Sequence, residues 1–283
     1  MCRTERPINH HWRHYLGRTR SAVINAFNGL LDPTACSYFA KLMAQAYDPH
    51  SHIDVLPEHR LIYVCIPKCA STTIKMTLSA LAGFKPTSFE QLHKRKYSGL
   101  PAPHHVGISN FYRLATDPKT LRFSFVRNPY DRLVSAWADK FQDKPLVPGD
   151  SFIHQYLRHR SEIDSSLPEG GDQTLSFDDF VTYAAATADR RVNAHWHLQA
   201  GMLDVPGIEL DIIGRVESFR TDFERVLDHL NACDQLRQKA FMLLNASPHR
   251  SWPEYYTQGL ADRVYRAYER DFDLLGYPRA VSR

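Results

Sequence analysis

Two apolar runs along the chain are each followed by a short polar turn and then by a segment with helical spacing. The first run, residues 61–66, is rich in β-branched and aromatic residues and stops at a proline, and a helix is expected over 72–82. The second run, residues 121–127, precedes an expected helix over 130–141. Strands joined through a helix and a long polar excursion, here residues 83–120, are expected to be parallel. The pattern therefore predicts an α/β fold with a central parallel sheet flanked by helices.

The remaining segments add one strand and several helices. A third short strand is expected over 210–214. Further helices are expected over residues 152–160, 176–187, 221–230, 234–244 and 257–271. Two Pro- and Gly-punctuated stretches are expected to be loops, residues 144–149 and 164–172. Residues 21–31 and 34–47 are each followed by an Asp-Pro pair and suggest a helical N-terminal arm, residues 1–57, ahead of one domain, residues 58–283.

The turn after the first strand carries residues suited to an anion. The first N–H groups of a helix have no partners within it, and they point at whatever lies in the turn. Lys68 adds a cation, and hydroxyl groups follow at Ser71, Thr72 and Thr73. The turn lacks the glycine pair and the GK[ST] order of the Walker A loop. From the residues alone, a phosphate site and an ordinary capped helix with a solvated lysine both stay open.

The second strand also ends in residues of chemical interest. Arg127 stands at its C-terminal end, where open α/β sheets place their ligands. In the helix that follows, Arg132 and Ser135 are three residues apart and could share a face. The sequence therefore predicts a second polar site at the carboxyl end of the sheet.

These segments resemble a known family. The stretches 67–73 and 126–137 are similar to the paired signatures of sulfotransferases that use 3′-phosphoadenosine 5′-phosphosulfate (PAPS). Three further stretches resemble the carbohydrate sulfotransferase branch, residues 193–199, 213–219 and 245–277. The resemblance implies a P-loop-like sulfotransferase fold. It also implies that a sulfuryl group passes from PAPS to a hydroxyl of a carbohydrate or glycoconjugate by in-line displacement, without a metal.

The resemblance also implies roles for the matched residues. Lys68 would be catalytic, because it would neutralise charge on the leaving oxygen. The 5′-phosphosulfate would be held by the loop residues Lys68, Cys69, Ala70, Ser71, Thr72 and Thr73. The 3′-phosphate would be held by Arg127 and Ser135. Arg250 is expected to close over the nucleotide, whereas Arg132 stays open between a cofactor contact and a surface ion pair.

A base for the acceptor hydroxyl is expected between the two phosphate motifs. Residues 103–107 resemble the His-Val element of the uronyl 2-O-sulfotransferase branch, in which a histidine serves as the base. That match makes His105 the second catalytic residue and His104 its neighbour. His195 and Glu217 remain alternative bases, and a purely structural histidine pair also stays open.

Three other features have open roles. Trp196 could face a sugar or fill the core, and core packing is favoured. Arg215 could contact the cofactor or the acceptor, or pair with Glu217. The basic run of residues 93–96 is typical of a solvated loop, although it could steer an anionic glycan.

Composition sets limits on the function. With 283 residues, 43% of them hydrophobic, the chain is long enough for a sizeable core. A net charge of +4 permits anionic ligands but does not indicate a nucleic-acid binder. No run of 18 apolar residues exists, so no membrane span is expected, and no metal-binding motif is evident. The five scattered cysteines favour a reducing compartment.

The expected location and the alternative functions follow from these limits. The methionine start without a membrane anchor favours a soluble, cytoplasmic bacterial enzyme, and a truncated relative would instead belong to the Golgi lumen. A P-loop-type nucleotide kinase is an alternative, although its GxxxxGK[ST] loop is missing. A non-catalytic nucleotide- or glycan-binding module is the other alternative.

Overall fold

A computed structural model describes residues 32–242 and 251–280. The described residues divide into two compact units. The first lies within Met1–Val126 and Leu203–Asn245, and the second within Arg127–Met202 and Ala246–Arg283. The helix expected over residues 21–31 falls outside the described residues.

The first unit is built on a four-stranded sheet in the order β1-β2-β3-β6. Its strands are β1 Ile53–Leu56, β2 Leu61–Val64, β3 Leu121–Val126 and β6 Ile212–Arg215. Strands β2 and β3 pair in parallel, as do β3 and β6, whereas β1 is antiparallel to β2. The predicted α/β class with a mostly parallel central sheet is therefore confirmed.

Strand β1 is a difference from the sequence prediction, which placed its residues in a helical arm. All four of its residues are buried, and a 3-10 turn at Pro57–His59 reverses the chain into β2. The arm does contain helices, α2 at Pro33–Gln45 and α3 at Pro49–His52. The boundary expected at residue 57 stays a prediction, although β1 belongs to the central sheet.

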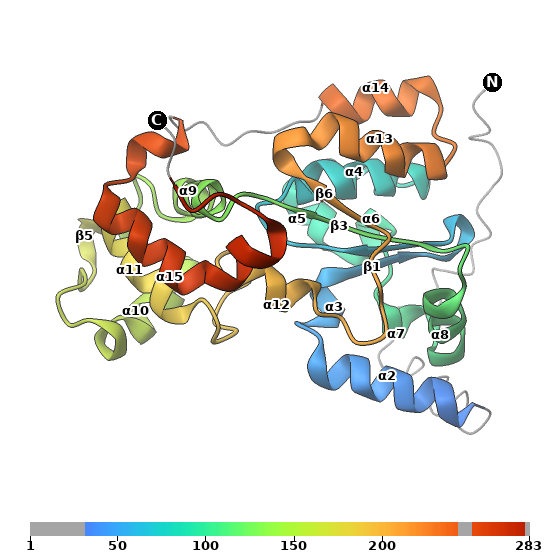
Figure 1. The fold of residues 1–283 in the computed structure, drawn as a ribbon, viewed down its shortest axis with the longest axis horizontal. Helices are drawn as coiled ribbons and strands as arrows, with labels where there is room; N and C mark the ends of the chain where they lie inside the picture. The colour runs from blue at the N-terminus through green and yellow to red at the C-terminus, as the bar shows by residue number, and fades with distance from the viewer. Residues whose placement is uncertain (1–31, 243–250, 281–283) are drawn as a thin grey trace. The chain divides into compact units, whose positions relative to one another are not determined.

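Helices cover both faces of this sheet (Figure 1). One face carries α4 Ser71–Leu81, α13 Phe219–His229 and α14 Asp234–Met242. The Phe125 ring of β3 contacts Phe219 and Phe223 of α13, with ring centroids 5.2 and 5.8 Å apart. On the other face, a buried cluster joins α2 and α8, Ile108–Thr116, to Ile62 and Val64 of β2. The apolar side chains of β2 and β3 thus reach cores on both sides, as expected for parallel strands.

The polar excursion between β2 and β3 contains more structure than the sequence indicated. Besides α8 it forms three short helices, α5 Phe89–His93, α6 Arg95–Ser98 and α7 Pro103–Val106. Each has only four or five residues, too few to show a helical period.

The second unit is mainly helical. Its helices are α9 Pro129–Lys140, α10 Ser151–Ile163, α11 Phe177–Thr187, the start of α12 Gln199–Leu203, and α15 Gln258–Leu275. Their buried faces form one aromatic core around Trp196, Tyr156 and Phe180. Where loops were expected, Pro145–Leu146 (β4) and Gly171–Thr174 (β5) pair as two short antiparallel strands.

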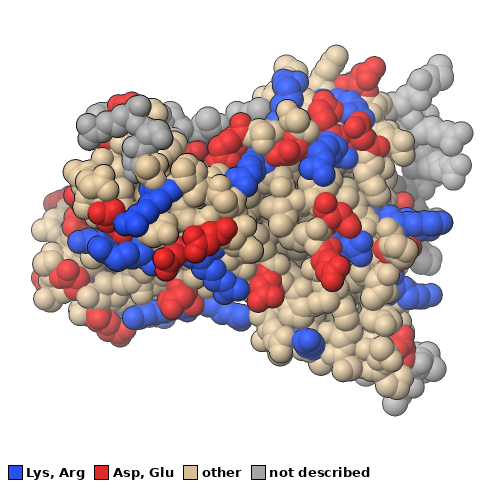
Figure 2. All heavy atoms as spheres, in the orientation of Figure 1, with Lys and Arg blue, Asp and Glu red and all other residues tan. Residues whose placement is uncertain are grey.

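Charged side chains of both signs are interspersed on the face shown in Figure 2. No described helix is both long and apolar enough to cross a membrane. Within residues 32–242 and 251–280, no three His, Cys, Asp or Glu side chains are grouped so as to hold a metal ion.

Candidate functional site

The turn between β2 and α4 has an unusual backbone. Lys68 and Ala70 both take the left-handed conformation, with φ angles of 69° and 57°. This conformation costs a residue with a side chain about 1–2 kcal/mol. Cys69, between them, is fully buried and does not have a positive φ. Alternation of left-handed and right-handed residues turns successive N–H groups toward one concavity, an arrangement that binds anions.

The N-terminus of α4 is also suited to an anion. Its N-cap residue is Ala70, and no side chain caps this end of the helix. Helices α2, α10 and α11 in contrast begin with capping bonds from Asp32, Asp150 and Ser176. An α4 of eleven residues presents its first amides and the positive end of its dipole to this turn. Lys68, Ser71 and Thr72 are partly exposed around it, whereas Thr73 is buried.

The histidine segment predicted to supply the base, residues 103–107, forms α7 and the glycine that follows it. The Ala102 N–H donates to His105 Nδ1 at 3.1 Å. His104 Nδ1 lies 2.8 Å from His50 Nδ1, and the rings of His104 and His105 have centroids 3.9 Å apart. Burial, together with the nearby charges of Arg95 and His50, lowers the pKa of His105 to about 4. Burial, with His105, His50 and Arg95 adding to it, lowers the pKa of His104 to about 3.

This geometry sets the tautomer of His105. Because Nδ1 accepts the Ala102 N–H, Nε2 carries the proton of the neutral ring. In this state Nε2 of His105 is a hydrogen-bond donor and cannot accept a proton. His105 becomes a base at Nε2 only if the ring moves its proton to Nδ1 and gives up the Ala102 bond. Its role as the base stays a prediction.

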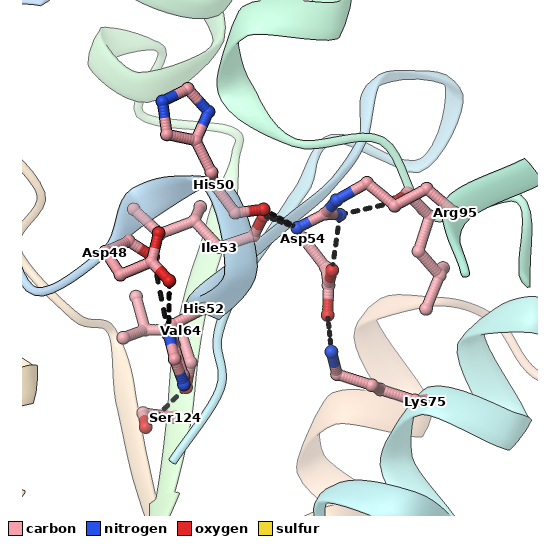
Figure 3. A network of polar contacts seen from close by, with 10 residues as sticks. Asp48, His50, His52, Ile53, Asp54, Val64, Lys75, Arg95 and Ser124 are labelled. Atoms are coloured by element: carbon pink, nitrogen blue, oxygen red, sulfur yellow. Dashed lines mark hydrogen bonds and ion pairs between the residues drawn. The ribbon is translucent and has the colours of Figure 1, made fainter. Parts of the chain in front are cut away.

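A cluster of charged side chains is buried around Asp54 (Figure 3). Asp54 of β1, 1% exposed, has Lys75 Nζ 3.2 Å from Oδ2 and Arg95 Nη1 2.8 Å from Oδ1. Arg95 also donates to the carbonyls of Leu100, at 2.6 Å, and of His50. The expectation of a solvated loop at 93–96 is therefore wrong for Arg95, which ties Asp54 of β1 to the backbone at His50, before the strand, and at Leu100, ahead of α7.

In the second unit, Arg127 follows the end of β3. Its guanidinium donates to both carboxylate oxygens of Asp131, from Nε at 2.7 Å and from Nη2 at 2.9 Å. Each side chain of the pair is 15% exposed. Asp131 was not identified from the sequence, although the spacing of four residues at the start of a helix could have indicated the pair.

The backbone of Arg127 is bound by a second side chain. The Arg127 N–H donates to Gln199 Oε1 at 3.0 Å, and Gln199 Nε2 donates to the Arg127 carbonyl at 2.8 Å. Asp271 of α15 accepts from the Gln199 and Ala200 N–H groups at 2.9 and 2.8 Å. No signal in the sequence pointed to Asp271.

Two residues of α9 differ in role. Ser135, predicted to bind the 3′-phosphate, is 3% exposed in this unit. Arg132 is 1% exposed and donates to the carbonyls of His197 and Ala194, both at 2.7 Å. The surface ion pair considered for Arg132 is therefore ruled out, and the residue supports the loop that carries the 193–199 motif.

The 193–199 motif is largely buried. Trp196 is fully buried, its Nε1 donates to Thr187 Oγ1 at 3.0 Å, and its carbonyl accepts from Tyr268. The preference for core packing is confirmed. His195 is half-buried and has Nδ1 2.9 Å from Asn193 Oδ1. Of the alternative bases, Glu217 is exposed on a 3-10 turn of the first unit.

The predicted site residues thus fall into two groups. The first unit holds residues 68–73, His104 and His105, and the second unit holds Arg127 and Ser135. Arg250 lies outside the described residues. Each group is organised within its own unit.

Comparison with known proteins assigns the chain to a family. The model of the family described as "Sulfotransferase family" matches residues 51–278. Carbohydrate sulfotransferase 11 of Mus musculus is 26% identical over 250 residues, which span 80% of this chain and 67% of the relative. Carbohydrate sulfotransferase 10 of Rattus norvegicus is 25% identical over 260 residues, with the same shares.

A third relative, carbohydrate sulfotransferase 14 of Danio rerio, is 28% identical over 240 residues, 80% of this chain and 62% of that protein. No solved structure matches the chain. The family match covers well over half of the sequence, including the turn after β2 and the end of β3, and the chain is therefore an enzyme of the sulfotransferase family.

Proposed function

We propose that this enzyme transfers a sulfuryl group from PAPS to a hydroxyl of a carbohydrate or glycoconjugate. The observation that carries the proposal is the turn between β2 and α4. There an uncapped helix N-terminus, two left-handed residues and Lys68 come together without a glycine. Such a turn fits a phosphate or phosphosulfate group, because its donors are backbone amides and a cation.

In this proposal the turn binds the 5′ side of the donor. The amides of Ala70 and Ser71 and the hydroxyls at 71–73 donate to the phosphate oxygens, whereas the Cys69 N–H donates to the Ile66 carbonyl at 3.3 Å. Lys68 neutralises the charge that grows on the bridging oxygen as the bond from that oxygen to sulfur breaks. Bound PAPS supplies the sulfuryl group and leaves as 3′,5′-adenosine bisphosphate. The acceptor oxygen forms the new bond to sulfur and loses its proton to a base.

The 3′-phosphate is assigned to the second unit. Arg127 and Ser135 bind it, and Arg250 closes over the nucleotide. The guanidinium of Arg127 already has one edge fixed by Asp131, so its plane is set before a phosphate arrives. Planar, charged donors of this kind recognise phosphate through paired hydrogen bonds.

The base is assigned to His105, with His104 beside it. Both rings have lowered pKa values and are neutral at physiological pH. Accepting the proton requires the tautomer change described above. Because this step displaces the Ala102 amide, we assign it to the complex with acceptor rather than to the ligand-free protein.

The acceptor class comes from the relatives. Those most similar include carbohydrate sulfotransferases 10, 11 and 14, at 25–28% identity. A carbohydrate hydroxyl is the acceptor that these names share. Specificity for one glycan depends on the loops of each enzyme.

A screen of glycan acceptors with sulfur-labelled PAPS tests the proposal. The PAPS reaction contains excess chelator, and ATP labelled in its γ-phosphate is run in parallel with Mg²⁺, with nucleoside monophosphates added as acceptors. We expect label from PAPS on at least one glycan and none from ATP. Label from ATP would instead support the nucleotide kinase, and PAPS binding without transfer to any glycan would support a binding module.

A further inference from the structure

The backbone of Arg127 is bound where the pairing of β3 ends. The last register pair of β3 with β6 is Val126 with Arg215. At the next residue the side-chain amide of Gln199 makes both backbone hydrogen bonds, at 3.0 Å to the N–H and 2.8 Å to the carbonyl. One side chain thus provides for Arg127 the two backbone bonds that a neighbouring parallel strand would provide through two of its residues.

The orientation of this amide is fixed by a buried carboxylate. Gln199 Nε2 lies between two acceptors, the Arg127 carbonyl at 2.8 Å and Asp271 Oδ2 at 3.4 Å. Its Oε1 faces the Arg127 N–H, a donor. A flipped amide would put Oε1 against both acceptors, so one orientation is favoured. Gln199 and Asp271 are both 0% exposed, so water does not replace a lost bond.

Asp271 is itself held by backbone amides. It accepts from the N–H groups of Gln199 and Ala200 at 2.9 and 2.8 Å. Burial raises its pKa, an effect opposed by these amides and by the charge of Arg132. The carboxylate therefore links α15 to the start of α12 and, through Gln199, to the backbone of Arg127.

We propose that Gln199 and Asp271 are positioning residues that set the direction in which Arg127 leaves the backbone. Arg127 is then held at both ends, at its peptide by Gln199 and at its guanidinium by Asp131. This inference rests on the proposed role of Arg127 in binding the 3′-phosphate. A shift of the peptide moves the whole guanidinium, so loss of the Gln199 bonds weakens recognition of that phosphate specifically.

The test is calorimetric titration with 3′,5′-adenosine bisphosphate and adenosine 5′-monophosphate, which differ in the 3′-phosphate. The wild type is compared with Gln199→Met, which keeps the length of the side chain and removes both polar atoms. We expect the preference for the bisphosphate to fall by about fivefold or more, the equivalent of one net hydrogen bond, with little change for the monophosphate. Gln155→Met is the matched control, since Gln155 also binds backbone in the second unit, at Val192, and we expect it to keep the preference.

A double variant separates positioning from general stability. If Gln199 acts through Arg127, adding Gln199→Met to Arg127→Ala lowers the preference no further. A further, additive loss, or an equal loss of affinity for both ligands, would overturn the inference and leave Gln199 as a stabilising residue. If circular dichroism shows that Gln199→Met does not fold, Asp271→Asn replaces it in the same titrations. We expect Asp271→Asn to lower the preference for the bisphosphate and to leave the affinity for the monophosphate unchanged.

The same titrations distinguish an error in the proposed 3′-phosphate site from an error in the role of Gln199. A wild type that binds both nucleotides equally removes the 3′-phosphate site, and the inference falls with it. A wild type that prefers the bisphosphate, with a Gln199→Met variant that keeps the full preference, overturns the inference alone.

Discussion

The carboxylate of Asp131 binds the guanidinium of Arg127 through two parallel hydrogen bonds, at 2.7 and 2.9 Å. The two residues are four apart and the pair is mostly buried, 15% exposed on each side. Two bonds hold the plane of the guanidinium as well as its position, which one bond to a lysine does not do. The pair thus fixes the plane of the Arg127 guanidinium within its unit.

The first prediction separates two properties of Arg127 that could recognise the 3′-phosphate, its positive charge and its planar guanidinium. Arg127→Ala should remove most of the preference for 3′,5′-adenosine bisphosphate over adenosine 5′-monophosphate, since a charge-assisted hydrogen bond contributes about 1.5–3 kcal/mol. Arg127→Lys keeps the charge but not the planar fork, and we expect it to recover less than half of that free energy. Calorimetry with both nucleotides measures the difference. A lysine variant as selective as the wild type would show that charge alone suffices.

The second prediction concerns the left-handed residue that starts α4. Ala70→Gly relieves the unfavourable φ and should stay within about 1 kcal/mol of the wild type in unfolding free energy while binding adenosine 5′-monophosphate normally. Ala70→Val adds a branched side chain at φ 57° and should destabilise by about 1–3 kcal/mol and weaken that binding.

Ala80→Val is the control for Ala70→Val, because Ala80 lies in the last turn of the same helix with ordinary helical geometry. It should change stability by less than about 1 kcal/mol and leave nucleotide binding intact. If the two valine variants behave alike, the conformation of Ala70 is not what shapes the turn.

The third prediction concerns the buried charges on β1. Asp54→Asn leaves Lys75 and Arg95 without their carboxylate, in a place where Lys75 is 7% exposed. The free energy of unfolding, measured in urea, should fall by about 3–5 kcal/mol. Asp117→Asn breaks the more exposed pair with Arg60, 33% and 52% exposed, and should cost less than about 1 kcal/mol. Similar small losses in both variants would mean that Asp54 is not the anchor of this cluster.

The fourth prediction concerns pH. In the folded protein the pKa of His105 is lowered to about 4 and that of His104 to about 3, from the ordinary histidine pKa of 6.5. The unfolded chain therefore binds more protons, and the unfolding free energy should fall as pH drops from about 6.5 toward 4. His104→Gln and His105→Gln should each make the unfolding free energy depend less on pH. His229→Gln, at an exposed position of α13, is the control and should leave this pH dependence unchanged.

The same lowered pKa values affect turnover. A neutral base persists well below pH 6.5, so the acidic fall in rate should lie nearer pH 4–5. If His105 is the base, His105→Ala should lower turnover by about 10²–10⁴-fold without changing affinity for 3′,5′-adenosine bisphosphate, and His104→Ala should be milder. Normal turnover in His105→Ala, with a loss on replacing His195 or Glu217, would move the base to one of those residues.

Local pattern was enough to predict the strand, turn and helix at each phosphate motif. Their apolar runs and helix starts are contiguous in the sequence, and β2, α4, β3 and α9 were found within a few residues of the expected bounds. An anion site in this turn could also be suggested from the sequence, because its lysine and hydroxyls are adjacent, and it stays a prediction. What the pattern did not contain was the left-handed backbone at Lys68 and Ala70, since neither position is a glycine.

The features that were missed depend on partners far along the chain. Strand β1 carries Asp54 in its middle, and that charge is buried only because Lys75 and Arg95 reach it. The sequence left Arg132 open between a cofactor contact and a surface ion pair, yet the carbonyls that it binds lie 62 and 65 residues later. Gln199 and Asp271 are 72 residues apart. No local period or spacing reports such contacts, because tertiary packing alone creates them.

The most direct measurement is a balance of donor and product in wild type and Lys68→Ala, with PAPS and an acceptor identified by the screen. We expect the wild type to form one 3′,5′-adenosine bisphosphate for each sulfated glycan. Lys68→Ala should turn over on the order of 10²-fold more slowly at saturating PAPS, with its affinity for the bisphosphate little changed. Lys85→Ala, at an exposed lysine shortly after α4, should match the wild type. Near-normal turnover in Lys68→Ala, or bisphosphate release without sulfated glycan, would contradict the proposed transfer at this turn.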